Sequence, residues 1–396
     1  MSPVRLKYAA RLNCRTLSEE TSPGRRLRYI DIEAVGPGVL IELPTEMTFG
    51  EAPSRARRLV AAGDTIVSTV RTYLRAIWPV TDPSDDLVVS TGFAVVTPGK
   101  TILPCYLAWA LQASSFVEEV VARSVGVSYP AINPSELGDI GITLPSIERQ
   151  RAVCDHLDRE TTRIDKLVAA KERLHQLLED RLQAELDDRI WAGHPRTIQL
   201  ARVARRIDVG IAEAATHAYA DVGIPLLRST NIRANGIDVK NILYIEPWFA
   251  DRNRSKTIRM NDILTVRTGN TGVSALVPQQ FDGAQCFTQL ITTIRAPNVA
   301  AFYCYALNSG PTRAYFRSVG WGSAQDNISV PLLSRAPVPL VEPTSQQIAV
   351  AAIRRAESRV TLALALLRRQ MTLLAERRRA LITAAVNDQV PIFNVP

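Results

Sequence analysis

The sequence predicts an α/β (α+β) protein in which two globular regions alternate with two long helices. Residues 146–191 contain neither Pro nor Gly, and Leu, Ala, Arg, Glu, Asp and Gln fill most positions, which favours one long helix. The same pattern returns later in the chain at a constant offset of 196 positions, so that Val350 and Ile353 match Cys154 and Leu157. These observations predict two tandem halves related by a pseudo-two-fold axis.

Each predicted helix carries a narrow seam whose residues are spaced alternately by three and four positions, as in coiled coils. The first seam consists of Cys154, Leu157, Ile164, Val168, Leu178 and Leu182, with Thr161, Lys171 and His175 as its polar members. The second seam consists of Ile353, Val360, Leu364, Leu367, Met371, Leu374, Leu381 and Ala385, interrupted by Glu357 and Arg378. Matching seams in one chain predict that the two helices pair as an antiparallel intramolecular coiled coil.

Short identical segments extend the repeat into the globular regions. Residues 69–71 (Thr-Val-Arg) match residues 265–267 at the offset of 196. Residues 123–126 (Arg-Ser-Val-Gly) recur as residues 317–320 at an offset of 194, which predicts a two-residue loop deletion. The expected domains are a globular region at 1–145, a helix at 146–193, a second globular region at 194–341 and a second helix at 342–390.

Short β-rich runs broken by Gly and Pro predict mixed α/β structure in both globular regions. A Ser at position 146 is a plausible N-cap of the first long helix, and Thr344 with Gln347 has the form of a capping box for the second. We expect strands at 28–33, 65–70, 87–89, 93–96, 140–142, 226–229, 263–266 and 290–295, and one helix in each region at 105–123 and 301–317.

Composition indicates a globular protein with a polyanionic partner. Of the 396 residues, 46% are hydrophobic and 22% charged, and no apolar run approaches the ~20 residues that span a bilayer, so we expect a cytoplasmic protein without a membrane role. The net charge of +8 favours nucleic acid, although an Arg-rich composition is also typical of a GC-rich genome. The five Cys and four His show no metal-ligand spacing, so no metal site is expected.

Candidate catalytic motifs fail on spacing or composition. Residues 99–101 (Gly-Lys-Thr) lack the preceding Gly and the immediate helix of a phosphate-binding loop. Residues 133–136 (Asn-Pro-Ser-Glu) lack the aromatic residue with which an amino-methyltransferase stacks a flipped base. No nucleophile elbow, H-E-x-x-H motif or nuclease carboxylate pair is present, so no catalytic residue is expected.

Two classes of loop are candidates for contact with DNA. The first follows the repeated Thr-Val-Arg segment, and the second follows the repeated Arg-Ser-Val-Gly segment and differs between the halves, as two readers of different sequences would. Guanidinium, amide, hydroxyl and ring groups there suit base edges or phosphates, although ordinary hairpin surface remains an alternative. The candidate DNA-binding residues are Arg71, Tyr73, Arg75, Arg123, Ser128, Tyr129, Arg267, Asn270, Arg317, Trp321, Ser323, Gln325 and Asn327.

Charge runs elsewhere remain open between phosphate contact and plain solvation. These are Arg55, Arg57 and Arg58 in the first half and Arg252, Arg254 and Lys256 in the second.

The arrangement resembles the specificity (S) subunit of type I restriction-modification systems over essentially the whole chain. The resemblance is carried by Leu144-Pro145 with Gln150 at the start of the first long helix, and by residues 157–161 (Leu-Asp-Arg-Glu-Thr) and Ile164-Asp165 within it. Further matching phrases are Gln347, residues 376–382, residues 29–33 and residues 63–66.

This resemblance implies that each globular region is a target recognition domain, similar to that of some monomeric adenine methyltransferases. The helices would be a spacer that also docks partner subunits, with Leu157, Ile164, Val168, Leu178, Leu182, Ile353, Val360, Leu364, Leu367, Met371 and Leu374 as the coiled-coil and docking residues. Bound to double-stranded DNA with a bipartite asymmetric target, the chain would direct adenine methylation by two methyltransferase subunits. It would also direct restriction when restriction/translocase subunits join.

The chain itself would have no activity. S-adenosylmethionine, ATP and Mg²⁺ would all belong to the partner subunits. A coiled-coil interaction scaffold without DNA recognition is the main alternative, and a self-contained nucleic-acid enzyme is a weaker one for want of a catalytic cluster.

Overall fold

The computed structural model describes residues 3–81, 84–193, 195–320 and 327–392. The chain folds into two compact units. Unit 1 comprises Met1–Glu172 and Arg368–Pro396, and unit 2 comprises Arg173–Leu367. Each unit therefore holds one globular head together with a segment of both long helices.

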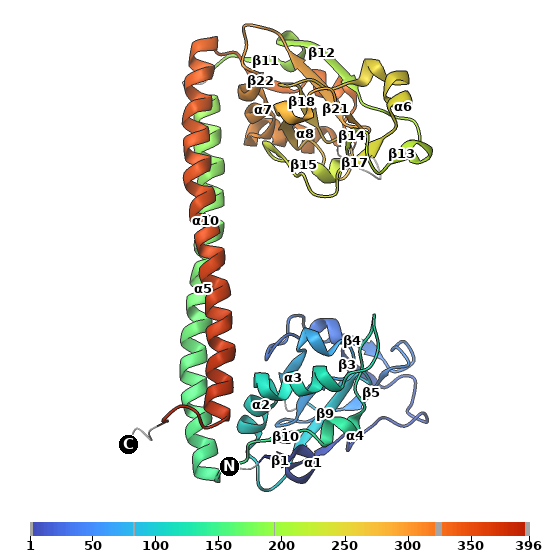
Figure 1. Cartoon of the computed structure of the whole chain (residues 1–396), viewed down its shortest axis with the longest axis vertical. Helices are drawn as coiled ribbons and strands as arrows, with labels where there is room; N and C mark the ends of the chain where they lie inside the picture. The colour runs from blue at the N-terminus through green and yellow to red at the C-terminus, as the bar shows by residue number, and fades with distance from the viewer. Residues whose placement is uncertain (1–2, 82–83, 194, 321–326, 393–396) are drawn as a thin grey trace. The chain divides into compact units, whose positions relative to one another are not determined.

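The head of unit 1 is built on two four-stranded sheets (Figure 1). The first has the order β2-β9-β6-β7 and the second the order β4-β3-β8-β5, in which β3 and β8 run parallel. The strands are β1 (Val4–Arg5), β2 (Ala10–Leu12), β3 (Arg26–Ile30), β4 (Thr45–Thr48), β5 (Ala56–Leu59), β6 (Thr65–Ser68), β7 (Ile77–Pro79), β8 (Leu87–Ser90), β9 (Phe93–Pro98) and β10 (Gly141–Ile142). The helices of this head are α1 (Leu6–Ala9), α2 (Pro104–Gln112), α3 (Ser114–Arg123) and α4 (Pro134–Gly138).

The head of unit 2 repeats the first of these sheets and three strands of the second, while the fourth strand of the second sheet lies at the opposite edge. Its sheets have the orders β12-β21-β18-β19 and β13-β17-β14-β20, and β14 runs parallel to β20 as β3 does to β8. The strands are β11 (Thr197–Gln199), β12 (Ala204–Val209), β13 (Tyr219–Ala220), β14 (Ile224–Leu227), β15 (Ile232–Arg233), β16 (Gly236–Ile237), β17 (Leu243–Ile245), β18 (Ile263–Thr265), β19 (Ser274–Leu276), β20 (Gln285–Cys286), β21 (Leu290–Ile294) and β22 (Pro337–Pro339). The helices are α6 (Pro247–Arg252), α7 (Ala300–Asn308), α8 (Gly310–Gly320) and α9 (Val330–Ser334). The predicted tandem repeat of mixed α/β heads is confirmed.

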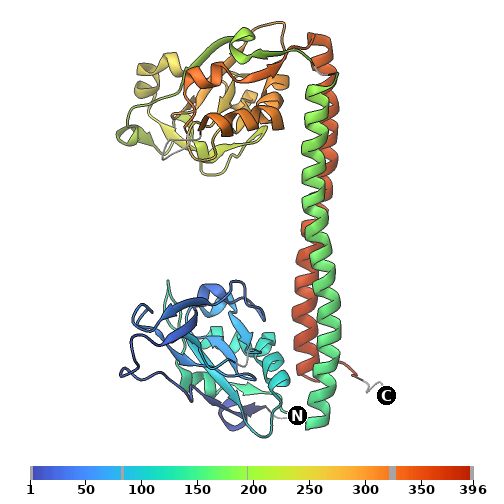
Figure 2. The ribbon, with the colours of Figure 1, turned by 180° about the vertical axis from the view of Figure 1, so that it is seen from behind.

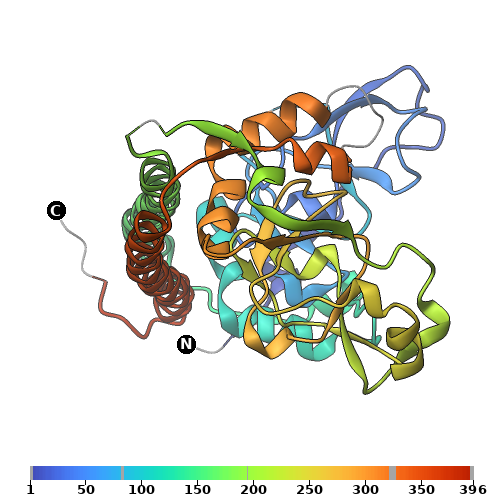
Figure 3. The same cartoon turned by 90° about the horizontal axis from the view of Figure 1, so that it is seen from above.

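The two long helices are α5 (Ile147–Trp191) and α10 (Pro343–Val386). Within each unit their segments lie side by side (Figure 2, Figure 3). In unit 1, Lys171 Nζ donates to Gln370 Oε1 (2.6 Å) and Arg378 pairs with Asp165 (3.4 Å), so residue numbers rise along one helix as they fall along the other. The helix pair is antiparallel, as predicted. None of the helices in the described residues has the length and apolar character to cross a bilayer.

The predicted seams lie on the less exposed faces of these helices. Several seam residues are fully buried, and the others are half-buried: Val168, Leu178, Leu182, Val360, Leu364, Met371, Leu374 and Leu381. In unit 1, Leu157 and Ile164 are buried. The polar seam residue Thr161 is also buried, and its hydroxyl is satisfied because it donates a hydrogen bond to Leu157 O. In unit 2, Ile353 is buried, and the polar seam member Glu357 accepts a hydrogen bond of 2.6 Å from Tyr305 Oη. Seam residues are thus covered by the partner helix and the head, and they form the coiled coil.

A glutamine that recurs in both halves binds each head to the start of a long helix through its side-chain amide. Gln150 accepts from Leu103 N–H (2.8 Å) and donates to Thr101 O (2.9 Å). Gln346, 196 positions later, accepts in the same way from Val299 N–H (2.7 Å). The second copy of the motif is therefore centred on Gln346, and the prediction of Gln347 was wrong by one position.

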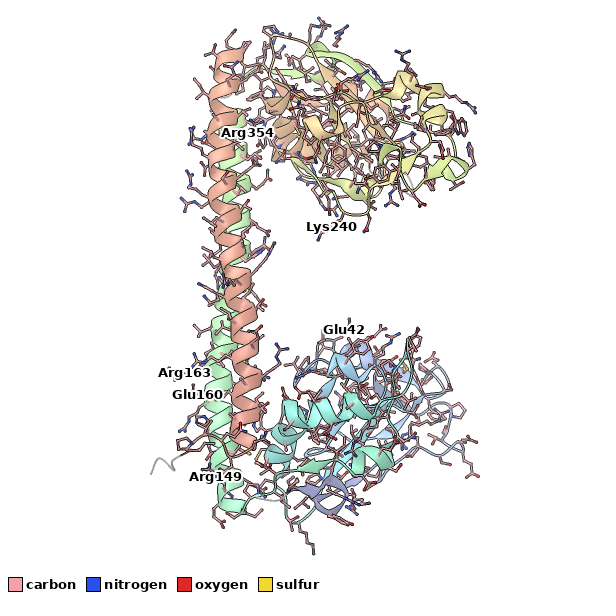
Figure 4. The ribbon with its side chains drawn as sticks, viewed as in Figure 1. Glu42, Arg149, Glu160, Arg163, Lys240 and Arg354 are labelled. Atoms are coloured by element: carbon pink, nitrogen blue, oxygen red, sulfur yellow. The ribbon has the colours of Figure 1, made fainter. Side chains whose placement is uncertain are left out.

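The two long helices begin differently from each other. Ser146 Oγ accepts from Arg149 N–H (3.4 Å), which is the expected N-cap contact. The helix α10 begins at Pro343, so Thr344 already lies inside it and the predicted capping box was wrong. At the start of α5, Arg149 also binds the segment after α10, donating to Ile392 O (2.7 Å) (Figure 4).

The single helix expected in each head is two helices. The break falls at Ala113, before α3, and at Ser309, before α8. It frees the first amide of the second helix, and a long helix supplies the acceptor: Ser114 N–H donates to Thr383 Oγ1 and Gly310 N–H to Asp187 Oδ1, both at 2.9 Å. The prediction was wrong because these caps come from residues remote in the sequence.

The predicted strand at 28–33 was also too long. It ends at Ile30, because Asp31 Oδ1 accepts from Ile32 N–H and opens the short 3₁₀ helix Ile32–Ala34.

Candidate nucleic-acid interface

In unit 1, the chain leaving β6 lies against the loop that follows α3. Arg71 N–H donates to Pro130 O (2.8 Å), and Ile132 N–H donates to Thr69 O (2.9 Å). Val125 and Ala131 exchange two backbone hydrogen bonds, which close the exposed loop between them. The two classes of candidate loop therefore form one surface, although they are about fifty positions apart in the sequence.

A stacked pair lies at the centre of this surface. The guanidinium of Arg71 lies 4.7 Å from the centroid of the Tyr129 ring, which is 62% exposed. The backbone of Arg71 is left-handed (φ 51°), and its hydrogen bond to Pro130 O holds it there. Stacking holds the planar guanidinium in place while its N–H groups remain available for a guanine edge or a phosphate.

Two carboxylates that were not predicted to contact DNA complete the surface, together with Arg55, whose charge run the sequence left open between phosphate contact and solvation. Asp31, Glu33 and Arg55 line a cavity of about 420 Å³ together with Arg71 and Tyr129. Arg55 is bound to the Tyr29 hydroxyl (3.2 Å) and to Asp31, and these two hydrogen bonds raise the pKa of its guanidinium. Glu33 is 3.9 Å from Arg71 and otherwise exposed. The surface offers both donors and acceptors, which suits base edges better than phosphates alone.

Two predicted residues of unit 1 are engaged elsewhere. Arg75 Nη1 donates to Ser114 Oγ (3.3 Å) and fastens the loop to α3. Arg123 pairs with Glu119 one turn earlier on α3 (2.9 Å). Tyr73 and Ser128 remain exposed on the two loops.

In unit 2, the corresponding loops also meet. Arg267 Nε donates to Asn327 Oδ1 (2.9 Å), and Thr268 pairs with Asn327 through a β-bridge. Asn270 is exposed in the turn after β18, and Arg317 is exposed on α8. Trp321, Ser323 and Gln325 lie outside the described residues.

Arg71 and Arg267 do not occupy equivalent positions. Ile132 in unit 1 corresponds to Ile328 in unit 2. The Ile132 N–H donates to Thr69 O, whereas the Ile328 N–H donates to Arg267 O. The structural counterpart of Arg267 is therefore Thr69. The local offset is therefore 198 at this strand, and the Thr-Val-Arg match at 196 was wrong as a structural alignment.

The Arg-Ser-Val-Gly match is also not a structural repeat. Residues 317–320 end the helix α8, whereas Ser124 and Val125 have already left α3. Before this segment, Ser114 corresponds to Gly310, and after it Ile132 corresponds to Ile328. Both pairs are 196 positions apart. The predicted two-residue deletion was therefore wrong.

Comparison with known proteins shows likeness in sequence to specificity subunits of type I restriction enzymes. The chain is 23% identical over 186 residues to the type I restriction enzyme EcoKI specificity subunit of Escherichia coli K12, a match covering 44% of this chain and 39% of that protein. It is 26% identical over 137 residues to the type I restriction enzyme HindI specificity subunit of Haemophilus influenzae, covering 34% and 29%. These matches span well under half the length of either relative. No family model matches the chain.

The fold gives a whole-chain likeness. A chain in a solved structure of complex assembly and conformational transition of the type I R-M system superposes with a TM-score of 0.75 and 20% identity, covering 97% of both chains. The resemblance to the specificity subunits of type I restriction-modification systems is thus confirmed, and the fold is shared with a chain of such a system.

Proposed function

We propose that this chain is the DNA-recognition specificity subunit of a type I restriction-modification complex. The observation that carries the proposal is the repetition of one head topology in both units, each with two loops meeting beyond the strand at the centre of its sheet. Sequence similarity to specificity subunits and the shared whole-chain fold support it.

Each head reads a different half of a bipartite, asymmetric target. The loop surface of unit 1 presents Arg71 stacked on Tyr129 beside the carboxylate of Glu33. That of unit 2 presents Arg267 bonded to the amide of Asn327. A guanidinium pairs with guanine O6 and N7, an amide with adenine, and a carboxylate with the cytosine amino group. Different side chains in the two heads therefore select different half-sites.

The chain binds and orients DNA, and partner subunits carry out the chemistry. Two methyltransferase subunits methylate adenine with S-adenosylmethionine, and restriction/translocase subunits cleave with ATP and Mg²⁺. Because the seam residues are buried or half-buried between the helices, the more exposed leucines of the long helices are the better candidates for docking these subunits. These are Leu167 and Leu373 in unit 1 and Leu174, Leu177, Leu362 and Leu366 in unit 2.

Methylome sequencing tests this proposal. A host expressing the chain with its methyltransferase subunit should gain methylated adenine in one two-block motif, and a host expressing the methyltransferase alone should not. The purified chain should also shift duplex DNA that contains the motif. Methylation with an unchanged motif when the chain is absent would contradict the proposal and favour a scaffold without a DNA role.

A further inference from the structure

Unit 2 contains a basic cavity that the loop surface does not use. It has a volume of about 640 Å³ and lies where the turn before β18, the segment after β21 and the first turns of α10 meet. Arg206, Arg259 and Arg354 line it, and Ile294, Val299 and Val350 form its apolar wall. Since β18 runs from Asp262 towards Arg267, the cavity and the candidate DNA loops lie at opposite ends of that strand.

Two of the three arginines form no salt bridge in the described part of the chain, although the charge of Arg354 also acts on the nearby Glu357 carboxylate. Arg206 is bound to Ser255 O (2.7 Å) and lies 3.5 Å from Asp208. Within the described part of the chain, neither the Arg259 nor the Arg354 side chain has a salt-bridge partner. Figure 4 labels Arg354 on the α10 segment of unit 2.

The carboxylate that lines the cavity is already occupied. Asp262 is 2% exposed, and it accepts from Arg259 N–H (2.9 Å) and from the Thr293 hydroxyl (2.6 Å). Asp262 therefore holds the turn before β18, and it forms no salt bridge with the guanidinium group of Arg259 or Arg354.

Unit 1 differs at both of the decisive positions. In the turn before β18, the Arg259 N–H donates to the Asp262 carboxylate, and in the same turn of unit 1 the Ala61 N–H donates to the Asp64 carboxylate. Ala61 is therefore the counterpart of Arg259. The residue 196 positions before Arg354 is Asp158, which accepts from Trp109 Nε1 (3.1 Å). The repeat thus places a guanidinium group without a salt bridge in unit 2 where unit 1 has a carboxylate that the head already binds.

A neighbouring exchange explains why the Arg354 side chain has no hydrogen-bond partner on the head, although its charge acts on the Glu357 carboxylate. The counterpart of Trp109 in unit 2 is Tyr305, and its hydroxyl donates to Glu357 instead of to position 354. Arg355 and Arg359, by contrast, match Arg159 and Arg163, so the neighbouring positions keep their charge in both halves. The difference between the units is therefore local to the cavity.

We propose that this cavity is a docking site for an acidic side chain of a partner protein subunit, and that unit 1 has no equivalent site. The inference rests on the proposed function, which supplies two copies of a methyltransferase subunit as partners. A concave cavity with an apolar wall fits a single carboxylate on a protein surface, whereas duplex phosphates favour an open basic face. The two docking positions are consequently unequal, and one methyltransferase subunit binds more tightly than the other.

The test compares Arg354→Glu and the double variant Arg259→Glu/Arg354→Glu with Arg355→Glu. The control makes the same charge reversal at the adjacent position of the same helix, outside the large cavity. Each variant is titrated with the purified methyltransferase subunit of the same system, and native mass spectrometry counts bound subunits. Circular dichroism checks that the variants are folded.

We expect wild type and Arg355→Glu to bind two methyltransferase subunits. Each Arg354 variant should lose one of them, with at least a tenfold weaker affinity for that subunit, because a buried partner charge is left unpaired. Specific duplex binding by the isolated chain should stay unchanged.

If the double variant binds two methyltransferase subunits with wild-type affinity, the docking site is rejected and the proposed function still stands. Loss of duplex binding without loss of a subunit would also overturn it and assign the cavity to DNA phosphates. A wild-type chain that binds no methyltransferase subunit would overturn the proposed function, and the docking site with it.

Discussion

Arg71 shows how one side chain can be held rigidly and still be available to a ligand. Its backbone amide is bound to Pro130 O, and its guanidinium lies on the Tyr129 ring. Little conformational entropy is then lost when the guanidinium binds a base edge. Arg267 is oriented by a different device, a hydrogen bond to Asn327.

Replacement of Arg71 or Arg267 with Ala should weaken binding to the specific duplex by ~1–3 kcal/mol, as expected for a bidentate contact with a base. Fluorescence anisotropy with the specific duplex and a scrambled duplex measures the effect. Arg123→Ala is the matched control, because Arg123 is paired with Glu119 on α3. Equal affinities for all three variants, with an unchanged methylation motif, would show that neither arginine reads a base.

At the scale of elements, side chains of the long helices cap the N-termini of helices in the heads. Asp187 on α5 accepts the Gly310 N–H at the start of α8, and Thr383 on α10 accepts the Ser114 N–H at the start of α3. Each cap satisfies an amide that has no partner within its own helix. These contacts couple the folding of each head to the long-helix segment of the same unit.

Asp187→Ala should destabilise α8 by about 1 kcal/mol, since it removes an N-terminal acceptor. Hydrogen exchange of peptides from α8 measures this local opening without requiring cooperative unfolding of the whole chain. Asp188→Ala is the control, because it removes the same charge from an exposed neighbour. Equal protection of α8 in the two variants would show that Asp187 is not a significant cap.

The same elements show which features a sequence can predict. The seams were predictable because an α-helix buries every third or fourth residue, a local property of the chain. The breaks at Ala113 and Ser309 were not, because their caps lie 269 and 123 positions away. Arg71 and Tyr129 were each predicted to face DNA, but their stacking depends on a loop pairing that the sequence does not encode locally.

Identical letters were a poor guide to the repeat in the heads. The Thr-Val-Arg segments sit two positions out of register, while the hydrogen-bonded Gln150 and Gln346 match at 196. Buried polar contacts constrain a position more than chance identity does, so they mark the repeat better than short matches on the loops.

At the scale of the whole molecule, tandem heads of one topology predict that recognition is modular. Exchange of residues 196–341 for those of a homologue should change one half of the bipartite motif and leave the other half intact. Methylome sequencing of the chimaera measures both halves at once. A change in both halves would show that the heads do not read independently.

The long helices should set the spacing between the two halves of the target. α5 has 45 residues, so it spans roughly 68 Å at about 1.5 Å per residue, comparable with about two turns of duplex. The border between the units crosses α5 after Glu172 and α10 after Leu367. Insertions near Ala169 and Ala365 therefore lengthen both helices close to this border, away from the segments that bind the heads.

One heptad inserted at each of these positions keeps the seam in register and adds about 10 Å, or about three base pairs of unread gap. We expect the variant to methylate the same two blocks at the wider spacing, as read by methylome sequencing. A two-residue insertion at each position is the control, because two residues turn an α-helix by about 200°, which faces the rest of the seam away from its partner and should destabilise the helix pair. A folded heptad variant that methylates the original spacing alone would show that the helices dock partner subunits without measuring DNA.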